Sequence, residues 1–418
     1  MGPLTLDRSV DDATSARSRV HVPRRGLCFC PTSSGPTSVP ATPSATVSPT
    51  STPAETPISQ LGVAVAEHIA GYYAVVLPAT KAIPPEVPQA REAGESLDSY
   101  AQRATEAANA AAGTIRDLVR LERQWLDSQD GASCPLVDRY GALLNAYSII
   151  ADAIWAAHYA PDPALLQSAL SSLDDLNVSV ATAVRAPAGA AEACEIGLDI
   201  SLGAPFGQVV GTQSADIARD PTRLHESAMG NLIADALRLK YENVAAAFVN
   251  SGGLRTDLVV SPASVGEQPG EITWGEMLSV LPFGNGTVIL TITGSQLEAA
   301  LVNGFTPACD PGFVGGTGRV PQLSGLRATF HCDGITPVVD GMWKTPEGVG
   351  GPEIPIGPAD AIRLVTVDYL YAGGDGYSML EEATDVHEPG DTLLDVAIDY
   401  LAAHSPVAPA IEGRVVGP

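Results

Sequence analysis

The sequence predicts an α+β protein with three successive parts: a disordered N-terminal tether, an antiparallel helical bundle and a mixed α/β domain. A Thr-, Ser- and Pro-rich tract dominates the first part, residues 1–58. Apolar residues then recur at helical spacing within residues 59–190. Short strands rich in Val, Ile and Leu alternate with helices over residues 200–416, which indicates an α/β or α+β domain.

The tether is predicted from the tract "PTSSGPTSVPATPSATVSPT" at 31–50, which has too few apolar residues to offset the entropy lost on ordering. Residues 1–27 contain no apolar run of the kind that an ordinary signal peptide carries. Cys28 and Cys30, just before the tract, resemble a lipidated cysteine with its surface tether, although the required upstream apolar segment is missing. We expect an extracytoplasmic or cell-surface location, with lipidation at either cysteine as one means of tethering.

The bundle is predicted to begin with "LGVAVAEHIAGYYAVVLP", residues 61–78, which resembles a membrane span. Glu67 and His68 lie near its middle, and a central charge costs roughly 2.5 kcal/mol or more on insertion. We therefore expect a packed helix and no transmembrane span. Apolar or small residues recur at steps of three and four in 97–118, 136–154 and 166–176, which predicts three more helices. No ionisable cluster lies on these faces, so the expected role is a scaffold or spacer.

The charge balance excludes some partners. The chain has 23 basic and 48 acidic residues and a formal charge of −25. Such a chain repels nucleic acid and anionic membranes, so no nucleic-acid partner is expected. An anionic ligand would need a locally basic site, which makes individual arginines informative.

The six cysteines form no CxxC pair of the kind that a structural zinc site uses. Cys134 precedes one predicted helix and Cys194 follows the next, so an antiparallel pair would bring both to the same end. Cys309 and Cys332 bracket a Gly-rich loop. We expect two disulfides and hence an exported protein. The alternative is four unrelated buried thiols.

Five short motifs follow one another in the C-terminal half. They are "RLHESAMGNLIADAL", "FVNSGGLRTDL", "WGEMLSVLPFGN", "TITGSQLEAAL" and "YLYAGGDGY". Each alone is weak, because Gly-rich turns after strands are common. Their order and separations together resemble the C-terminal domain of the 5′-nucleotidase family, over roughly residues 200–416. The resemblance implies a domain that holds the nucleoside part of a nucleotide substrate.

The resemblance assigns base and ribose contacts to three residues. Phe283 and Tyr369 match the two aromatic rings that sandwich the base, and stacking of this kind contributes roughly 1–3 kcal/mol per base. Asp375 matches the carboxylate that accepts hydrogen bonds from the ribose hydroxyls, a task suited to a pure acceptor. The alternatives are that both rings are core residues and that Asp375 caps its own Gly-rich turn.

The resemblance also gives a role to the bare turn in "FVNSGGLRTDL". Asn250 matches a base-side amide and Arg255 a guanidinium near the phosphate or ribose, while Gly252 and Gly253 let the backbone bend sharply and keep the approach clear. Arg223 matches a second substrate-facing arginine, and two converging arginines would create the positive field that a phosphate needs. The alternative is a strand and a tight turn in which the glycines take positive φ.

The family hydrolyses its phosphoester with two metal ions held by a separate metallophosphoesterase domain. The ligand motifs of that domain are not found, and the seven histidines are isolated from one another. We therefore expect no cofactor in this chain, with divalent metals only where a metallophosphoesterase partner chain supplies them. The sequence predicts a protein of nucleotide catabolism that binds a nucleotide or nucleoside. The alternatives are a non-catalytic cell-surface nucleoside-binding or interaction module, and a purely structural domain.

Overall fold

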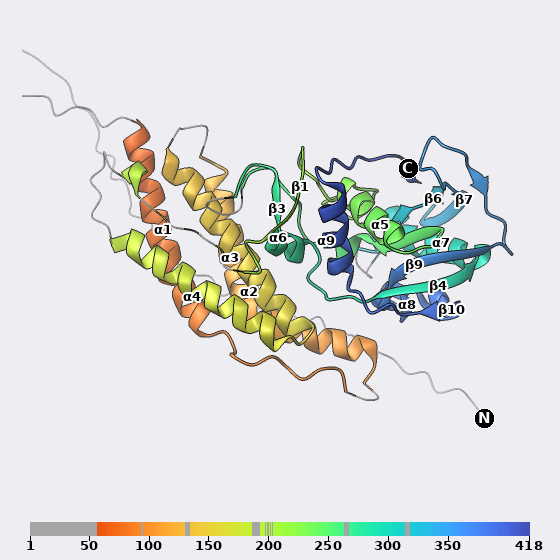
Figure 1. The fold of residues 1–418 in the computed structure, drawn as a ribbon, viewed down its shortest axis with the longest axis horizontal. Helices are drawn as coiled ribbons and strands as arrows, with labels where there is room; N and C mark the ends of the chain where they lie inside the picture. The colour runs from red at the N-terminus through yellow and green to blue at the C-terminus, as the bar shows by residue number, and fades with distance from the viewer. Residues whose placement is uncertain are drawn as a thin grey trace, which may run out of the picture. The chain divides into compact units, whose positions relative to one another are not determined.

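The computed structural model describes residues 57–92, 95–129, 134–185, 193–196, 198, 200, 202, 204–262, 267–313 and 318–418. Within Ala54–Pro418 these residues belong to one compact unit. The predictions for the tether and for Cys28 and Cys30 lie outside the described residues. The fold class is confirmed, because a helical region precedes a C-terminal region of helices and mixed sheets (Figure 1).

Four helices form the N-terminal region of this unit. They are α1 (Pro57–Lys81), α2 (Leu97–Leu126), α3 (Pro135–Tyr159) and α4 (Pro163–Arg185). Helix α3 packs against the other three and is buried along most of its length. It begins at a proline, whose fixed φ suits the first helical position. On α2 the predicted apolar positions Ala104, Ala108, Ala111 and Ile115 are buried, as the period of 3.6 requires.

Helix α1 contains the stretch that resembles a membrane span. Within it, Gln60–Lys81 is long and apolar enough to cross a membrane, which is weak evidence because it rests on length and composition alone. Val65, Ile69, Tyr72 and Val76 form a buried stripe toward the other helices, whereas Glu67 is exposed. The helix therefore has the amphipathic character of a packed bundle helix.

The C-terminal region is built on a five-stranded sheet with the order β10-β4-β9-β2-β5. Strand β2 is parallel to β9, and the other pairs are antiparallel. The strands are β2 (Ala246–Asn250), β4 (Thr287–Thr293), β5 (Pro321–Ser324), β9 (Ala361–Val367) and β10 (Thr384–His387). All five residues of β2 are buried, so this strand ends at the centre of the domain.

Two smaller sheets and further helices complete the domain. One sheet has the order β11-β6-β7-β8 and the other pairs β1 with β3. Their strands are β1 (Val209–Thr212), β3 (Glu271–Thr273), β6 (Leu326–Asp333), β7 (Thr336–Lys344), β8 (Ile354–Pro355) and β11 (Val415–Val416). The helices are α5 (Ala228–Lys240), α6 (Trp274–Val280), α7 (Gly294–Cys309), α8 (Asp368–Tyr371) and α9 (Leu393–His404). Helix α5 packs on β2 and β5, and α7 packs on β4 and β7.

The bundle and the C-terminal region share a continuous hydrophobic core. Helix α6 packs directly against α3 (Figure 1). Gly275 makes this contact possible, because a Cβ at this position would lie 2.6 Å from Cγ2 of Ile149. The N-terminus of α6 is fixed by a capping box between Thr273 and Glu276.

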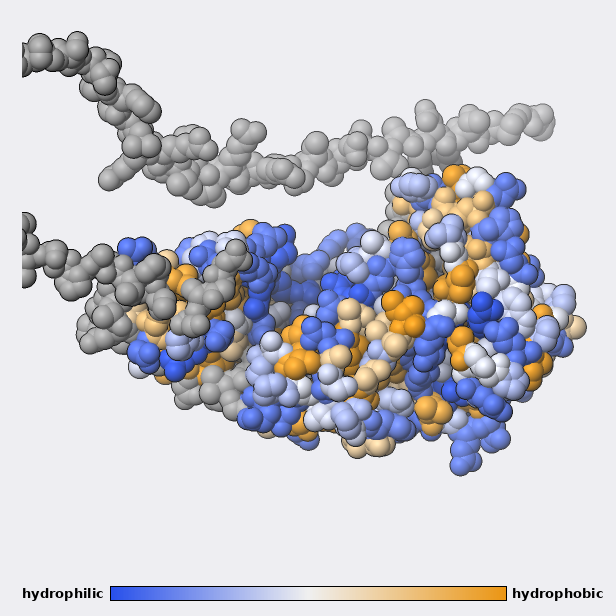
Figure 2. Space-filling model, turned by 90° about the horizontal axis from the view of Figure 1, so that it is seen from above, coloured by the Kyte–Doolittle hydropathy of each residue, from blue (hydrophilic) through white to orange (hydrophobic). Residues whose placement is uncertain are grey.

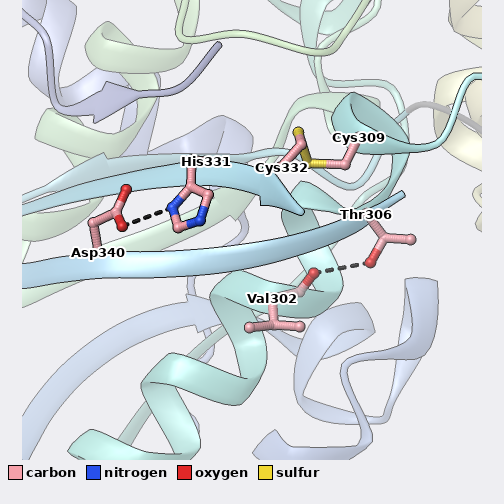
Figure 3. Close-up of a disulfide and its surroundings, with 6 residues drawn as sticks. All are labelled: Val302, Thr306, Cys309, His331, Cys332 and Asp340. Carbon is pink, nitrogen blue, oxygen red and sulfur yellow. Dashed lines mark hydrogen bonds and ion pairs between the residues drawn. A yellow bond between two sulfur atoms is a disulfide. The ribbon is translucent and has the colours of Figure 1, made fainter. Parts of the chain in front are cut away.

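Both predicted disulfides are formed. Cys134 bonds to Cys194 and Cys309 bonds to Cys332, with Cα–Cα distances of 5.3 and 5.4 Å. The second disulfide joins the end of α7 to β6 (Figure 3). The residue next to Cys332 on β6, His331, forms a hydrogen bond with Asp340 on the neighbouring strand β7. The alternative of four separate thiols is wrong. Disulfides of this kind are typical of oxidising compartments.

The face of the molecule drawn in Figure 2 is mostly hydrophilic. Figure 2 shows hydrophobic residues in small groups between hydrophilic ones on the face drawn. Exposed large hydrophobic residues such as Val178 and Ile411 are separated along the chain, a distribution that is ordinary for a soluble surface.

Candidate functional site

A cavity of about 330 Å³ lies between the loops of the C-terminal region and the helices α2 and α3. It is lined by all eight predicted site residues, Arg223, Asn250, Gly252, Gly253, Arg255, Phe283, Tyr369 and Asp375, and by Ala101, Thr105, Tyr159, Asn285 and Gly318. Residues that are more than 150 positions apart in the sequence thus meet at one opening.

The bare turn after β2 forms one edge of the cavity. Ser251–Gly253 is a 3₁₀ turn, η2, that directly follows the strand. Neither of its glycines has positive φ, so the explanation that the glycines are needed for positive φ is wrong. The Gly252 amide donates to the Gly318 carbonyl at 2.7 Å. A Cβ on Gly318 would lie 2.7 Å from the Gly252 Cα. Gly252 lacks a side chain because two backbones pass each other here.

Asp375 is the centre of a hydrogen-bond network. The Asn250 Nδ2 donates to its Oδ2 at 2.7 Å, and the Tyr369 hydroxyl donates to its Oδ1 at 3.1 Å. The Asp375 amide donates back to the Tyr369 hydroxyl at 3.2 Å, and the Asn303 Nδ2 donates to the Asp375 carbonyl at 3.0 Å. Each carboxylate oxygen keeps capacity to accept a further donor.

Asp375 also has a restrained backbone. Its φ of 53° lies in the left-handed region, which costs a non-glycine residue about 1 kcal/mol or more. Burial raises the pKa of Tyr369, and the nearby Asp375 carboxylate adds to this effect. The Tyr369 hydroxyl therefore stays protonated at neutral pH and remains a donor. The carboxylate is held in one orientation facing the cavity.

Phe283 joins the cavity to the bundle. Its ring lies edge-to-face with Trp155 at 5.4 Å and with Tyr159 at 5.3 Å between centroids. These two bundle residues stack on each other at 4.9 Å. Phe283 is half-buried, so it both packs against the core and lines the cavity. Phe283 and Tyr369 share the cavity, and no ring contact joins them among the described aromatic pairs.

Two arginines, Arg223 and Arg255, make one corner of the cavity, the one beside Phe283, positive. Arg255 lies with its Cζ 5.6 Å from the centroid of Phe283 and donates to the Gly252 carbonyl at 3.2 Å. Burial lowers the pKa of Arg255 to about 10, and the positive charges of Arg223, Arg116 and Arg219 contribute. Burial also lowers the pKa of Arg223. Both groups stay protonated at neutral pH, so the corner carries at least two positive charges.

The bundle contributes residues to the lining of the cavity, while its expected role as a scaffold or spacer stays a prediction. Ala101 and Thr105 of α2 and Tyr159 at the end of α3 form part of the wall of the cavity. Tyr100 fixes this wall, because its hydroxyl donates to the Tyr159 carbonyl at 3.0 Å. The sequence offers one signal for this contact, the aromatic pair "WAAHY" at the end of α3, whose members stand four residues apart on one helix face.

The metal ions that the resemblance implies do not fit the described residues. No group of three or more His, Cys, Asp or Glu side chains in this part of the chain could hold an ion. Histidines with a hydrogen-bonding partner are His68 with Glu122, His158 with Ile154, His225 with Asp220, His331 with Asp340 and His404 with Tyr400. Each therefore faces a carboxylate or a backbone carbonyl and belongs to no ligand cluster.

Comparisons with known proteins agree with the motifs. Residues 208–382 match the family described as 5′-nucleotidase, C-terminal domain. Over 208 residues the chain is 32% identical to the trifunctional nucleotide phosphoesterase protein YfkN of Bacillus subtilis, covering 48% of this chain and 13% of that protein. Over 205 residues it is 31% identical to a snake venom 5′-nucleotidase of Macrovipera lebetinus, covering 46% of this chain and 48% of that protein.

Two further relatives have the same limited extent. Cell wall protein Lmo0130 of Listeria monocytogenes is 30% identical over 198 residues, which cover 46% of this chain and 24% of that protein. A crystal structure of a 5′-nucleotidase precursor from Thermus thermophilus is 26% identical, with a TM-score of 0.44, covering 62% of this chain and 44% of that chain. The chain thus spans less than half the length of these relatives.

Proposed function

We propose that the cavity around Asp375 binds a nucleoside or nucleotide and that the protein acts in nucleotide catabolism, because residues 208–382 match the 5′-nucleotidase C-terminal domain. The observation that carries the proposal is the meeting of two aromatic rings, one restrained carboxylate and two arginines in one cavity. A flat base, a sugar with paired hydroxyls and a phosphate require these three kinds of group.

In the proposed complex the base lies between Phe283 and Tyr369. Stacking on aromatic rings contributes roughly 1–3 kcal/mol per base and tolerates different bases. The ribose hydroxyls donate to Asp375, whose two oxygens are already oriented by Asn250 and Tyr369. The phosphate lies toward Arg255, which has no ion pair with a carboxylate in the described part of the chain.

The proposed activity of this chain is binding, with phosphoester hydrolysis assigned to a metallophosphoesterase partner chain that supplies the metal ions. One feature supports the alternative of a non-catalytic binding module: Thr105 and Tyr159 of the bundle line the cavity. The two disulfides favour an extracellular setting for either activity.

The proposal is tested by calorimetric titration of the full chain with adenosine and with 2′,3′-dideoxyadenosine. We expect saturable binding of adenosine and at least about tenfold weaker binding of the dideoxy compound, because two hydroxyl donors to Asp375 are missing. Asp375→Asn should remove most of this preference. Equal binding of both compounds would contradict the role of Asp375.

A phosphate-release assay with AMP and added Mn²⁺ separates the binding proposal from autonomous catalysis. We expect negligible release by this chain alone, since the described residues offer no cluster for a metal pair. Robust turnover by the purified chain would show that the chain is itself the hydrolase.

A further inference from the structure

A second cavity, of about 820 Å³, lies beside the first, between α2, α3 and the loop that follows β2. Arg255 lines both cavities, so the two are adjacent at this residue. We propose that this second cavity, here called the arginine groove, binds the phosphate chain of a nucleotide that carries two or more phosphates. The inference rests on the proposed function of the first cavity, and it identifies the ligand class as nucleoside di- and triphosphates.

The arginine groove has an excess of positive charge. It is lined by four arginines, Arg116, Arg120, Arg123 and Arg255, and by two carboxylates, Asp117 and Asp152. The whole chain has 23 basic residues against 48 acidic ones, so a local excess of guanidinium groups reverses the overall balance. An electropositive recess in an acidic protein concentrates anions where the rest of the surface repels them.

Three of the arginines stand on one stripe of α2. Arg116, Arg120 and Arg123 follow the spacing i, i+4, i+7, which places them on a single helix face over roughly 10 Å of helix axis. The row extends the positive charge away from Arg255, as an elongated ligand with several charges requires. Guanidinium groups bind phosphate oxygens through paired N–H donors, which gives geometric selectivity as well as attraction.

Two of these arginines, Arg123 and Arg255, form no salt bridge with a carboxylate in the described residues. Arg123 donates to the Gly141 carbonyl and to the Asn145 side chain, and Arg255 donates to the Gly252 carbonyl, so each has only uncharged acceptors in the described residues. Burial lowers the pKa of both groups. The charges of Asp152 and Asp127 offset this burial only in part. Partly buried cations that form no salt bridge are unfavourable, and an anion in the groove would relieve this cost.

The other two arginines keep donors available. Arg116 contacts Asp152 through Nε at 2.9 Å, which leaves its two terminal nitrogens for a ligand. Arg120 pairs with Asp117 at 2.7 Å, and both side chains are mostly exposed at 63% and 70%. Exposed pairs of this kind contribute about 0–1 kcal/mol, so a polyphosphate can compete for Arg120 at little cost.

The test is a calorimetric series on the full chain with adenosine, AMP, ADP, ATP and inorganic tripolyphosphate, in EDTA at fixed ionic strength. We expect affinity to rise along the series from AMP to ATP by at least about tenfold. Thr114, an exposed α2 residue lining the groove, allows a matched pair of variants. Thr114→Glu should remove most of the gain by repelling the phosphates, whereas the uncharged Thr114→Gln should retain it.

Arg120→Gln tests the stripe itself, since this exposed side chain can be changed with little effect on folding. It should weaken ATP binding about fivefold or more and leave adenosine binding unchanged. Arg91→Gln, at an exposed position outside both cavities, is the control for loss of one positive charge. Its ATP affinity should stay within about twofold of the wild-type value.

The outcomes separate this inference from the proposed function. If adenosine binds but ATP binds no more tightly than AMP, or if the gain survives in Thr114→Glu, the inference is overturned and the proposed function stands. If tripolyphosphate binds and adenosine does not, the proposed function fails, and the nucleotide assignment of the groove fails with it.

Discussion

Phe283→Leu separates the packing role of this ring from its role in binding. Leucine keeps much of the side-chain volume but loses the aromatic face. Stacking on a base contributes roughly 1–3 kcal/mol, and because Phe283 already packs against Trp155 and Tyr159, we expect the lower part of that range. A loss of about 1–2 kcal/mol corresponds to adenosine binding about fivefold to thirtyfold weaker.

The same substitution should lower the free energy of unfolding by about 1–2 kcal/mol, because two edge-to-face contacts of roughly 0.5–1.5 kcal/mol each are partly replaced by aliphatic contacts. Adenosine titration and urea denaturation measure the two effects on the same preparation. Phe330→Leu is the matched control, since Phe330 stacks on Phe305 at 4.0 Å and lines no part of the first cavity. It should lose stability and keep adenosine affinity. Unchanged affinity in Phe283→Leu, within about twofold, would refute the stacking argument.

Three further predictions concern the network, a disulfide and a buried acid. Tyr369→Phe removes the hydroxyl that orients Asp375 but keeps the ring that stacks on the base. Adenosine affinity measured by calorimetry should therefore fall about fivefold to tenfold. An unchanged affinity would mean that Asn250 alone is sufficient to orient Asp375. Replacing Cys134 and Cys194 together by Ala should lower the free energy of unfolding, measured in urea, by up to about 4 kcal/mol. The reason is that the bond spans 60 residues and so restricts the unfolded chain. A loss below about 1 kcal/mol would contradict this entropic explanation. Burial, with Glu267 nearby, raises the pKa of Glu276 to about 7. Between about pH 4.5 and 7 the folded state therefore binds a proton that the unfolded state has lost. As the pH rises through this range, the free energy of unfolding should fall by up to about 3 kcal/mol relative to Glu276→Gln. Parallel pH profiles of the unfolding free energy for the wild type and Glu276→Gln would contradict the raised pKa of Glu276.

Much of the site could be predicted because local motifs fix it. Each motif places its functional residue at the end of a strand or in a turn, and sheet topology brings these ends together. Asn250 ends β2, and Asp375 follows β9, which is parallel to β2 and next to it. The resemblance of these motifs to the 5′-nucleotidase C-terminal domain was therefore sufficient to identify loop residues that line the cavity.

The contribution of the bundle could not be predicted in the same way. Tyr159 and Thr105 reach the cavity because α3 docks on α6 through Gly275, a contact between segments more than 100 residues apart. No local pattern specifies which end of a helix meets a distant loop. The arginine stripe on α2 could not be predicted for a related reason, since its residues have the spacing of an ordinary solvated helix face and only the groove beside Arg255 distinguishes them.

The glycines show where residue type misleads. Gly252 and Gly253 suggested a turn with positive φ, yet neither has one, and at Gly252 the constraint is the passing Gly318 segment. A sequence identifies the need for a missing side chain but not whether φ or a close neighbour imposes it.

The central claim is that a nucleoside occupies the cavity between Phe283 and Tyr369. A crystal structure of the full chain with AMP tests it most directly. We predict a base stacked between these two rings, with ribose hydroxyls within hydrogen-bonding distance of Asp375. AMP bound elsewhere, or a cavity that remains without ligand at millimolar AMP, would contradict the account.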